Sequence, residues 1–126
     1  MSDNSKQILV ETRAYYLPDQ SEPTANRYVF GYTITIRNIG TTPARLTHRH
    51  WQITDANGKV EEVHGEGVIG KKPYFNPGEI YEYSSGVMIE TPVGAMQGHY
   101  DMQAANGEHF TAPIAPFGLA VPGSVH

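Results

Sequence analysis

Glycine and proline interrupt this chain so often that a long helix has little room to form. The 126 residues include 13 glycines and nine prolines, and both residue types are unfavourable inside a helix. Between these interruptions β-branched residues predominate, with nine valines, nine isoleucines and ten threonines against four leucines. β-branched side chains favour strands over helices. The sequence therefore predicts an all-β fold.

The segment 28–37 gives the clearest strand pattern, because apolar residues occupy every second position. Those positions are Tyr28, Phe30, Tyr32, Ile34 and Ile36. Side chains alternate between the two faces of a strand, so this face is expected to be buried. Comparable patterns, each bounded by turn-forming residues, predict further strands at about 8–16, 45–55, 60–64, 81–89, 96–104 and 108–121.

The strand predicted at 45–55 requires an irregularity, because Leu46 and Trp51 have opposite parity. If both face the core, a β-bulge lies between them, around His48 or Arg49. We expect Trp51 to pack between two sheets. The Asn-Gly pair at 57–58 then predicts a hairpin turn with positive φ at Gly58.

The number of strands predicts how the chain is organised. Seven or eight short antiparallel strands are most economically packed as a two-sheet β-sandwich. Pro113 and Pro116 lack a backbone donor, so the last strand belongs at a sheet edge. We expect one domain over residues 1–126, with 1–6 as a flexible N-terminal tail.

Charge and cysteine content exclude several classes of function. The formal net charge is −4, and the isoelectric point near 5.8 disfavours binding to duplex nucleic acid. The absence of cysteine excludes disulfides, thiolate metal sites and cysteine nucleophiles. Residues 1–7 lack the basic and apolar regions of a signal peptide, and no apolar run is long enough to span a membrane. We therefore expect a cytoplasmic location and no membrane partner.

A glycine-rich loop at 64–71 matches the pattern G-x-G-x-x-G through Gly65, Gly67 and Gly70. A dinucleotide site needs a helix to begin at this loop, but the prolines at 73 and 77 prevent one. Two interpretations remain. The glycines either form a tight turn and bulge, or curl successive N–H groups around an anion, assisted by Lys71 and Lys72. Glu66, inside the loop, would repel such an anion.

Two histidines provide a candidate metal site. His48 and His50 lie two residues apart on a predicted strand, so both project from one face. They could share a divalent cation, with His99 or Asp101 as a further ligand. The alternative is that they are solvated surface side chains. We therefore assign no metal centre and no cofactor, and no combination of residues indicates an enzyme.

Several motifs occur together with characteristic spacing over about residues 10–122. They are Gln20–Pro23, Tyr28–Phe30, Ile34–Asn38, Arg49–Trp51, Ile53–Asp55, Glu62–Gly70, Pro77–Glu79, Tyr83–Gly86 and Glu90–Tyr100. In these motifs the sequence resembles the ApaG family. His48 is not part of the family pattern.

The resemblance implies an immunoglobulin-like or fibronectin type III-like β-sandwich and a small bacterial cytoplasmic protein associated with cobalt resistance and magnesium efflux. Related domains in eukaryotes resemble protein-binding modules, and the family's glycine motif has been considered a pyrophosphate site. No enzymatic activity is implied.

Three functional hypotheses follow. The first is a non-enzymatic binding module for an unknown partner protein. The second, an alternative to it, is binding of phosphate, pyrophosphate or a dinucleoside polyphosphate at Gly65, Gly67, Gly70 and Lys71. The third is divalent-cation binding at histidines. The sequence leaves the oligomeric state open, a homodimer included.

Overall fold

Eight strands and two short 3₁₀ turns make up the fold in the computed structural model, which describes residues 7–124. In chain order they are β1 (Ile8–Tyr16), η2 (Pro18–Gln20), η3 (Pro23–Ala25), β2 (Tyr28–Asn38), β3 (Ala44–Asp55), β4 (Val60–Glu66), β5 (Tyr74–Phe75), β6 (Ile80–Ile89), β7 (Val93–Ala104) and β8 (His109–Ala120). The N-terminal tail expected at 1–6 lies outside the described residues, and the assignment of 1–126 to one domain stays a prediction.

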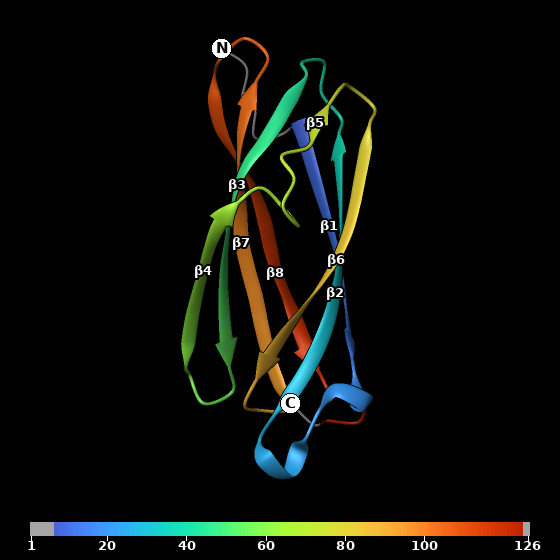
Figure 1. The fold of residues 1–126 in the computed structure, drawn as a ribbon, viewed down its shortest axis with the longest axis vertical. Helices are drawn as coiled ribbons and strands as arrows, with labels where there is room; N and C mark the ends of the chain where they lie inside the picture. The colour runs from blue at the N-terminus through green and yellow to red at the C-terminus, as the bar shows by residue number, and fades with distance from the viewer. Residues whose placement is uncertain (1–6, 125–126) are drawn as a thin grey trace.

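The strands form two antiparallel sheets that pack face to face (Figure 1). One sheet has the order β1-β2-β6, and the other has the order β4-β3-β7-β8 with β5 added to β3. This confirms the predicted immunoglobulin-like or fibronectin type III-like sandwich, in which a buried tryptophan lies on the third strand. The seven longer strands are those that the alternating pattern predicted, whereas β5 is too short to produce a pattern. Within residues 7–124, no helix has the length and apolarity needed to cross a membrane.

Two register shifts interrupt the regular pairing of the larger sheet. Between β3 and β7 the pairing skips Thr47, because Leu46 faces Met102 and His48 faces Asp101. The predicted bulge is therefore present, one residue earlier than expected. The second shift lies between Met96 and Gly98 of β7, opposite Phe117 and Ile114 of β8. The edge position of β8 is confirmed by the strand order.

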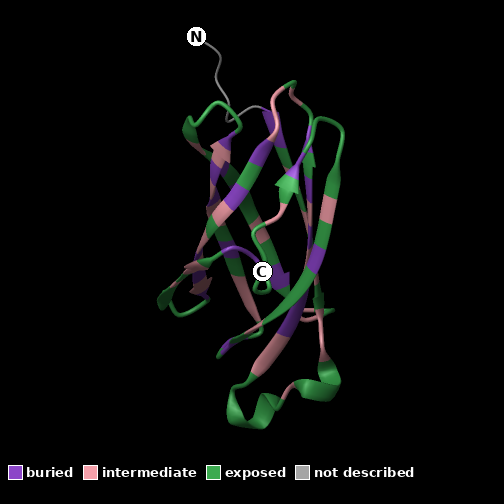
Figure 2. Ribbon diagram, turned by 45° about the horizontal axis from the view of Figure 1, so that its top comes forward, coloured by how far each residue is buried: buried purple, intermediate pink, exposed green. Residues whose placement is uncertain are grey.

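Trp51 is buried between the sheets, as predicted, with 4% of its surface exposed. Its ring contacts Tyr32 of the opposite sheet at a centroid distance of 5.4 Å and Phe117 of β8 at 5.9 Å, both edge-on. Burial alternates along the long strands, so apolar faces point inward and polar faces outward (Figure 2). The aromatic cluster around Trp51 is thus a central part of the core.

Two buried tyrosines link the sheets by a hydrogen bond. The hydroxyls of Tyr83 on β6 and Tyr100 on β7 are 2.5 Å apart. Burial raises the pKa of both phenols above their ordinary value, because the charged form would lose its solvation. Each hydroxyl has a partner, so the pair costs no unsatisfied polar group in the core.

The hairpin between β3 and β4 turns at Asn57 and Gly58, and the predicted positive φ at Gly58 is confirmed at 84°. Asp55 organises the turn, because its Oδ1 accepts hydrogen bonds from the backbone N–H groups of Asn57 and Lys59. Asn57 itself is not among the residues with positive φ. The loop is therefore a turn followed by a left-handed glycine rather than a two-residue type I′ turn.

Truncating Trp51 should strongly destabilise the fold. Trp51→Ala is expected to lower the free energy of unfolding by about 3–5 kcal/mol, because a large buried ring is replaced by a cavity. Urea denaturation followed by circular dichroism measures this change. Ile80→Ala is the control, since Ile80 is 53% exposed, and a change within about 0.5 kcal/mol is expected. Equal effects of the two substitutions would contradict the central position of Trp51.

The backbone conformation of Gly58 can be tested separately from packing. A Cβ at Gly58 or at Gly118 would meet no atom within 4 Å, but only Gly58 has a positive φ. Gly58→Ala is therefore expected to cost about 1 kcal/mol, whereas Gly118→Ala should be neutral or slightly stabilising. Thermal denaturation of both variants provides the comparison. Similar melting temperatures would mean that the left-handed turn imposes no strain.

Candidate functional site

The glycine-rich loop forms a tight turn whose backbone groups are largely bonded within the protein. Val68 and Lys71 exchange two backbone hydrogen bonds of 2.8 and 3.0 Å, and Gly67 N–H donates to Thr47 O at 2.8 Å. Ile69 and Gly70, at the tip, have φ values of 48° and 70°. Two successive left-handed residues are typical of a type I′ turn. Three amides of the loop thus already have carbonyl partners.

Arg49 holds this loop from the side. Its Nη1 donates to the carbonyl oxygens of Glu66 and Gly67, both at 3.1 Å. A Cβ at Gly65 would lie 2.6 Å from the guanidinium of Arg49. Gly65 leaves space for the guanidinium in this position, whereas Gly67 is needed because a Cβ there would lie 2.0 Å from the backbone oxygen of Lys71.

Two lysine side chains, Lys71 and Lys72, lie beside the loop. Lys72 Nζ lies 3.1 Å from Glu66 Oε2, and the hydrogen bond from Lys72 lowers the pKa of the Glu66 carboxyl. Lys71 is exposed at the same end of the loop. Of the predicted anion-binding residues, Gly65 lies at the end of β4, whereas Gly67, Gly70 and Lys71 lie on or directly beside the turn that follows it.

A groove opens where the two sheets diverge. On one side of the sandwich β1 packs against β8, whereas β4 and β6 make no comparable contact among the described residues. A cavity of about 380 Å³ lies there. Its walls include Tyr32, Trp51 and Met96 from the core, and Val63 and Met88 from the two strands. We call this cavity the β4–β6 groove.

Both strands that border the β4–β6 groove are sheet edges. Among residues 7–124, β6 pairs only with β2, and β4 pairs only with β3. The sequence could not indicate this groove, because its residues come from five strands, β2, β3, β4, β6 and β7, which belong to both sheets. Only the order of strands in each sheet shows which edges remain unpaired.

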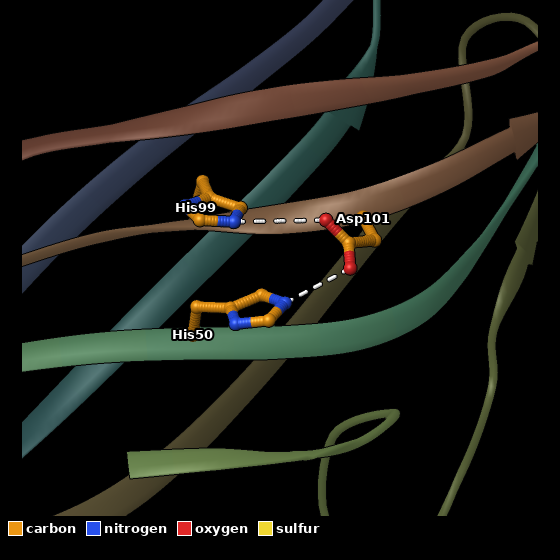
Figure 3. Close-up of side chains that lie close together, drawn as sticks. All are labelled: His50, His99 and Asp101. Atoms are coloured by element: carbon orange, nitrogen blue, oxygen red, sulfur yellow. Dashed lines mark hydrogen bonds and ion pairs between the residues drawn. The ribbon is translucent and has the colours of Figure 1, made fainter. Parts of the chain in front are cut away.

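The outer face of β3 and β7 carries a cluster of histidines and one carboxylate, shown in Figure 3. His50 Nε2 lies 2.9 Å from Asp101 Oδ2, and His99 Nε2 lies 3.6 Å from Asp101 Oδ1. The rings of His50 and His99 stack at a centroid distance of 4.3 Å. Potential ligand atoms of these three residues all lie within 4.8 Å of one another.

Of the two histidines that the sequence paired, only one belongs to the cluster. His50 belongs to the cluster, together with His99 and Asp101, the further ligands considered from the sequence. His48 is exposed, and its Nδ1 lies 3.2 Å from Thr47 Oγ1. A residue that sequence reasoning missed is His64, whose Nδ1 is 2.7 Å from His50 Nδ1. The pairing of β4 with β3 places His64 directly opposite His50.

Comparison with known proteins identifies the family. The model of the ApaG domain matches residues 18–104. Protein ApaG from Azotobacter vinelandii is 54% identical over 126 residues, which cover both chains completely. Protein ApaG from Xylella fastidiosa is 57% identical over 122 residues, covering 97% of this chain and 96% of the relative.

Solved structures agree with these relatives. The X-ray structure of a structural-genomics target is 48% identical, with a TM-score of 0.93, and the match covers 98% of this chain and 94% of that one. The crystal structure of an ApaA protein from Bordetella pertussis is 45% identical, with a TM-score of 0.91 and coverage of 93% and 95%. Because a family model and full-length relatives both match, this chain belongs to the ApaG family.

Proposed function

We propose that this chain is a small, non-enzymatic binding domain that recognises a partner protein through the β4–β6 groove. The observation that supports this function is a groove of mixed polar and apolar lining that is bordered by two unpaired strand edges. An extended segment of a partner can add to such an edge by main-chain hydrogen bonds, while its side chains enter the neighbouring groove.

The edge of β6 is suited to this mode of binding. Ser84, Ser85 and Gly86 are successive exposed residues with small side chains, and Ser85 and Gly86 line the groove. Small side chains leave the main-chain N–H and C=O groups of an edge accessible. The partner segment is therefore expected to pair along the middle of β6.

Apolar side chains provide the contact area inside the groove. Met88 on β6 is 49% exposed, although it is a large apolar residue. Methionine adapts its shape and is common at binding surfaces. Arg49 and Glu61 also line the groove, so the walls carry both charges beside an apolar floor. We expect the partner segment to place an apolar side chain between Met88 and Val63.

The cellular part of this proposal comes from family membership. We propose a cytoplasmic location, and that the partner connects the domain to cobalt resistance and magnesium efflux. Under this proposal the domain has no catalytic step of its own, and its contribution is the recognition of another protein.

Met88→Glu should remove partner binding without disturbing the fold. A charge at this position would have to be desolvated when the groove is filled, which opposes association. We expect at least a tenfold loss of specifically captured protein when the purified chain is used as bait in lysate from its native cell. Quantitative mass spectrometry measures the captured proteins.

Ile80→Glu is the matched control for this experiment. Ile80 lies on the same strand, is 53% exposed and does not line the groove. A partner retained by wild type and Ile80→Glu but lost with Met88→Glu supports the proposal, whereas identical captured proteins would contradict it. Analytical ultracentrifugation of wild type and Met88→Glu shows whether the partner is a second copy of this chain. A dimer of wild type that Met88→Glu dissociates and Ile80→Glu retains would contradict binding of a different protein in the groove.

A second candidate function is the binding of pyrophosphate, or of a dinucleoside polyphosphate, at the glycine-rich loop. Three cationic side chains, Arg49, Lys71 and Lys72, lie beside this turn. In addition, Ile69 is β-branched with a φ of 48° and is 57% exposed. Strained residues of this kind cluster at functional sites.

Charge substitutions distinguish this second function from a purely structural turn. If the loop binds pyrophosphate, Lys71→Gln should weaken binding, and Glu66→Gln should strengthen it because Lys72 loses its carboxylate partner. Both effects should shrink as salt is added. Isothermal titration with pyrophosphate at two ionic strengths measures them. A titration without saturable heat for any of the three proteins would exclude this function.

A further inference from the structure

We propose that His50, His99 and Asp101 bind one divalent transition-metal ion of the kind that imidazole favours, with Zn²⁺ as the representative. Two imidazole nitrogens and a carboxylate oxygen are ligands of this class of ion. Mg²⁺ and Ca²⁺ prefer sites built from oxygen ligands, so they should not compete. None of the three ligands lines the β4–β6 groove or belongs to the glycine-rich loop.

The positions of the three side chains follow from strand pairing. His50 and His99 are directly opposite one another in the β3–β7 pairing, and Asp101 lies two residues beyond His99 on the same face. Figure 3 shows both rings turned toward the carboxylate. The ligands therefore come from paired strands in the middle of a sheet, which holds their backbones rigidly.

The distances need only a small adjustment to surround an ion. Tetrahedral Zn²⁺ with ligand bonds of about 2.0–2.1 Å separates its ligand atoms by about 3.3 Å. His50 Nε2 lies 2.9 Å from Asp101 Oδ2, and His99 Nε2 lies 3.6 Å from the other carboxylate oxygen, Oδ1. With one ligand atom from each residue, the three atoms lie within 4.8 Å of one another, so they must move closer together to bind the ion. Rotation about the side-chain torsions of His50 and His99 can close the remaining separation, because both side chains are partly exposed, at 27% and 43%.

An ion can reach this cluster from solvent. A cavity of about 300 Å³ opens on the same face, and His50, His64 and His99 are among the residues that line it. Three protein ligands leave the fourth position of a tetrahedral ion open toward this cavity. That position would be taken by water or by a donor atom of another molecule.

His64 acts through His50 as a positioning residue. An ionised Asp101 only accepts hydrogen bonds, so His50 Nε2 donates to Asp101 Oδ2 before the metal binds. In a neutral His50 ring, Nδ1 then accepts from His64 Nδ1–H at 2.7 Å. When Nε2 binds the metal, the hydrogen of His50 must be on Nδ1, which then donates to His64. His64 can serve either tautomer, as partners of metal-bound histidines commonly do.

Titration of the full chain with Zn²⁺, by calorimetry in a buffer that does not bind metal, tests the proposal. Wild type should bind one ion at this site, and His50→Ala, His99→Ala and Asp101→Asn should each weaken binding at least tenfold. His64→Ala should weaken binding by about tenfold, the scale found when an orienting partner is removed. A large excess of Mg²⁺ should leave the Zn²⁺ affinity unchanged.

His48→Ala is the matched control, because His48 is an exposed histidine two residues from His50 on the same strand. It should bind Zn²⁺ like wild type. Zn²⁺ binding that survives all three cluster substitutions, or that depends equally on His48, would overturn the proposal. Long-range ¹H–¹⁵N spectra provide a second measurement, since the hydrogen of His50 should move from Nε2 to Nδ1 when Zn²⁺ is added. An unchanged His50 tautomer in the presence of saturating Zn²⁺ would also overturn it.

Discussion

The antiparallel pairing of β3 with β7 is the constraint on which the rest of the structure depends. On its inner face this ladder places Trp51 beside Gly98, and a Cβ at Gly98 would lie 1.9 Å from His50 O. The glycine thus permits the close approach of the two backbones at the point where the indole is packed. On the outer face the same ladder places His50 beside His99. The register of the β3–β7 pairing therefore determines both the packing of Trp51 in the core and the position of the histidine cluster on the outer face.

The glycine-rich motif is accounted for largely by backbone geometry. The three glycines have different surroundings: Gly65 leaves space for the guanidinium of Arg49, Gly67 approaches the Lys71 carbonyl, and Gly70 has a φ of 70° at the turn. Arg49 then joins the turn to β3 through two hydrogen bonds. A pattern that resembles a nucleotide-binding motif can thus be required for folding, because tight turns and phosphate-binding loops need the same conformational freedom.

Much of the fold could be predicted from the sequence, because alternation and turn residues are local signals. The candidate sites were harder to predict from the sequence. His64 faces His50 only because the loop at 55–59 contains a left-handed glycine, and a two-residue loop at 57–58 would have placed Gly65 there instead. The pairing of His50 with His99 joins residues 49 positions apart, with a bulge nearby, and no local signal specifies it. The β4–β6 groove depends on which edges stay unpaired, a property of the whole topology.

The two bulges in the larger sheet have a consequence for how the chain reaches its native pairing. A strand that slips by two residues keeps its inward and outward faces, so alternation alone does not exclude that error. Each of the two ladders that β7 forms contains one such irregularity. It lies at Thr47 in the pairing with β3, and between Met96 and Gly98 in the pairing with β8. A slipped ladder would bring a bulged segment against a regular one and lose hydrogen bonds there. The bulges thus favour the native register over registers that are shifted by two residues. A single favoured register limits misfolded intermediates and the aggregation that follows from them.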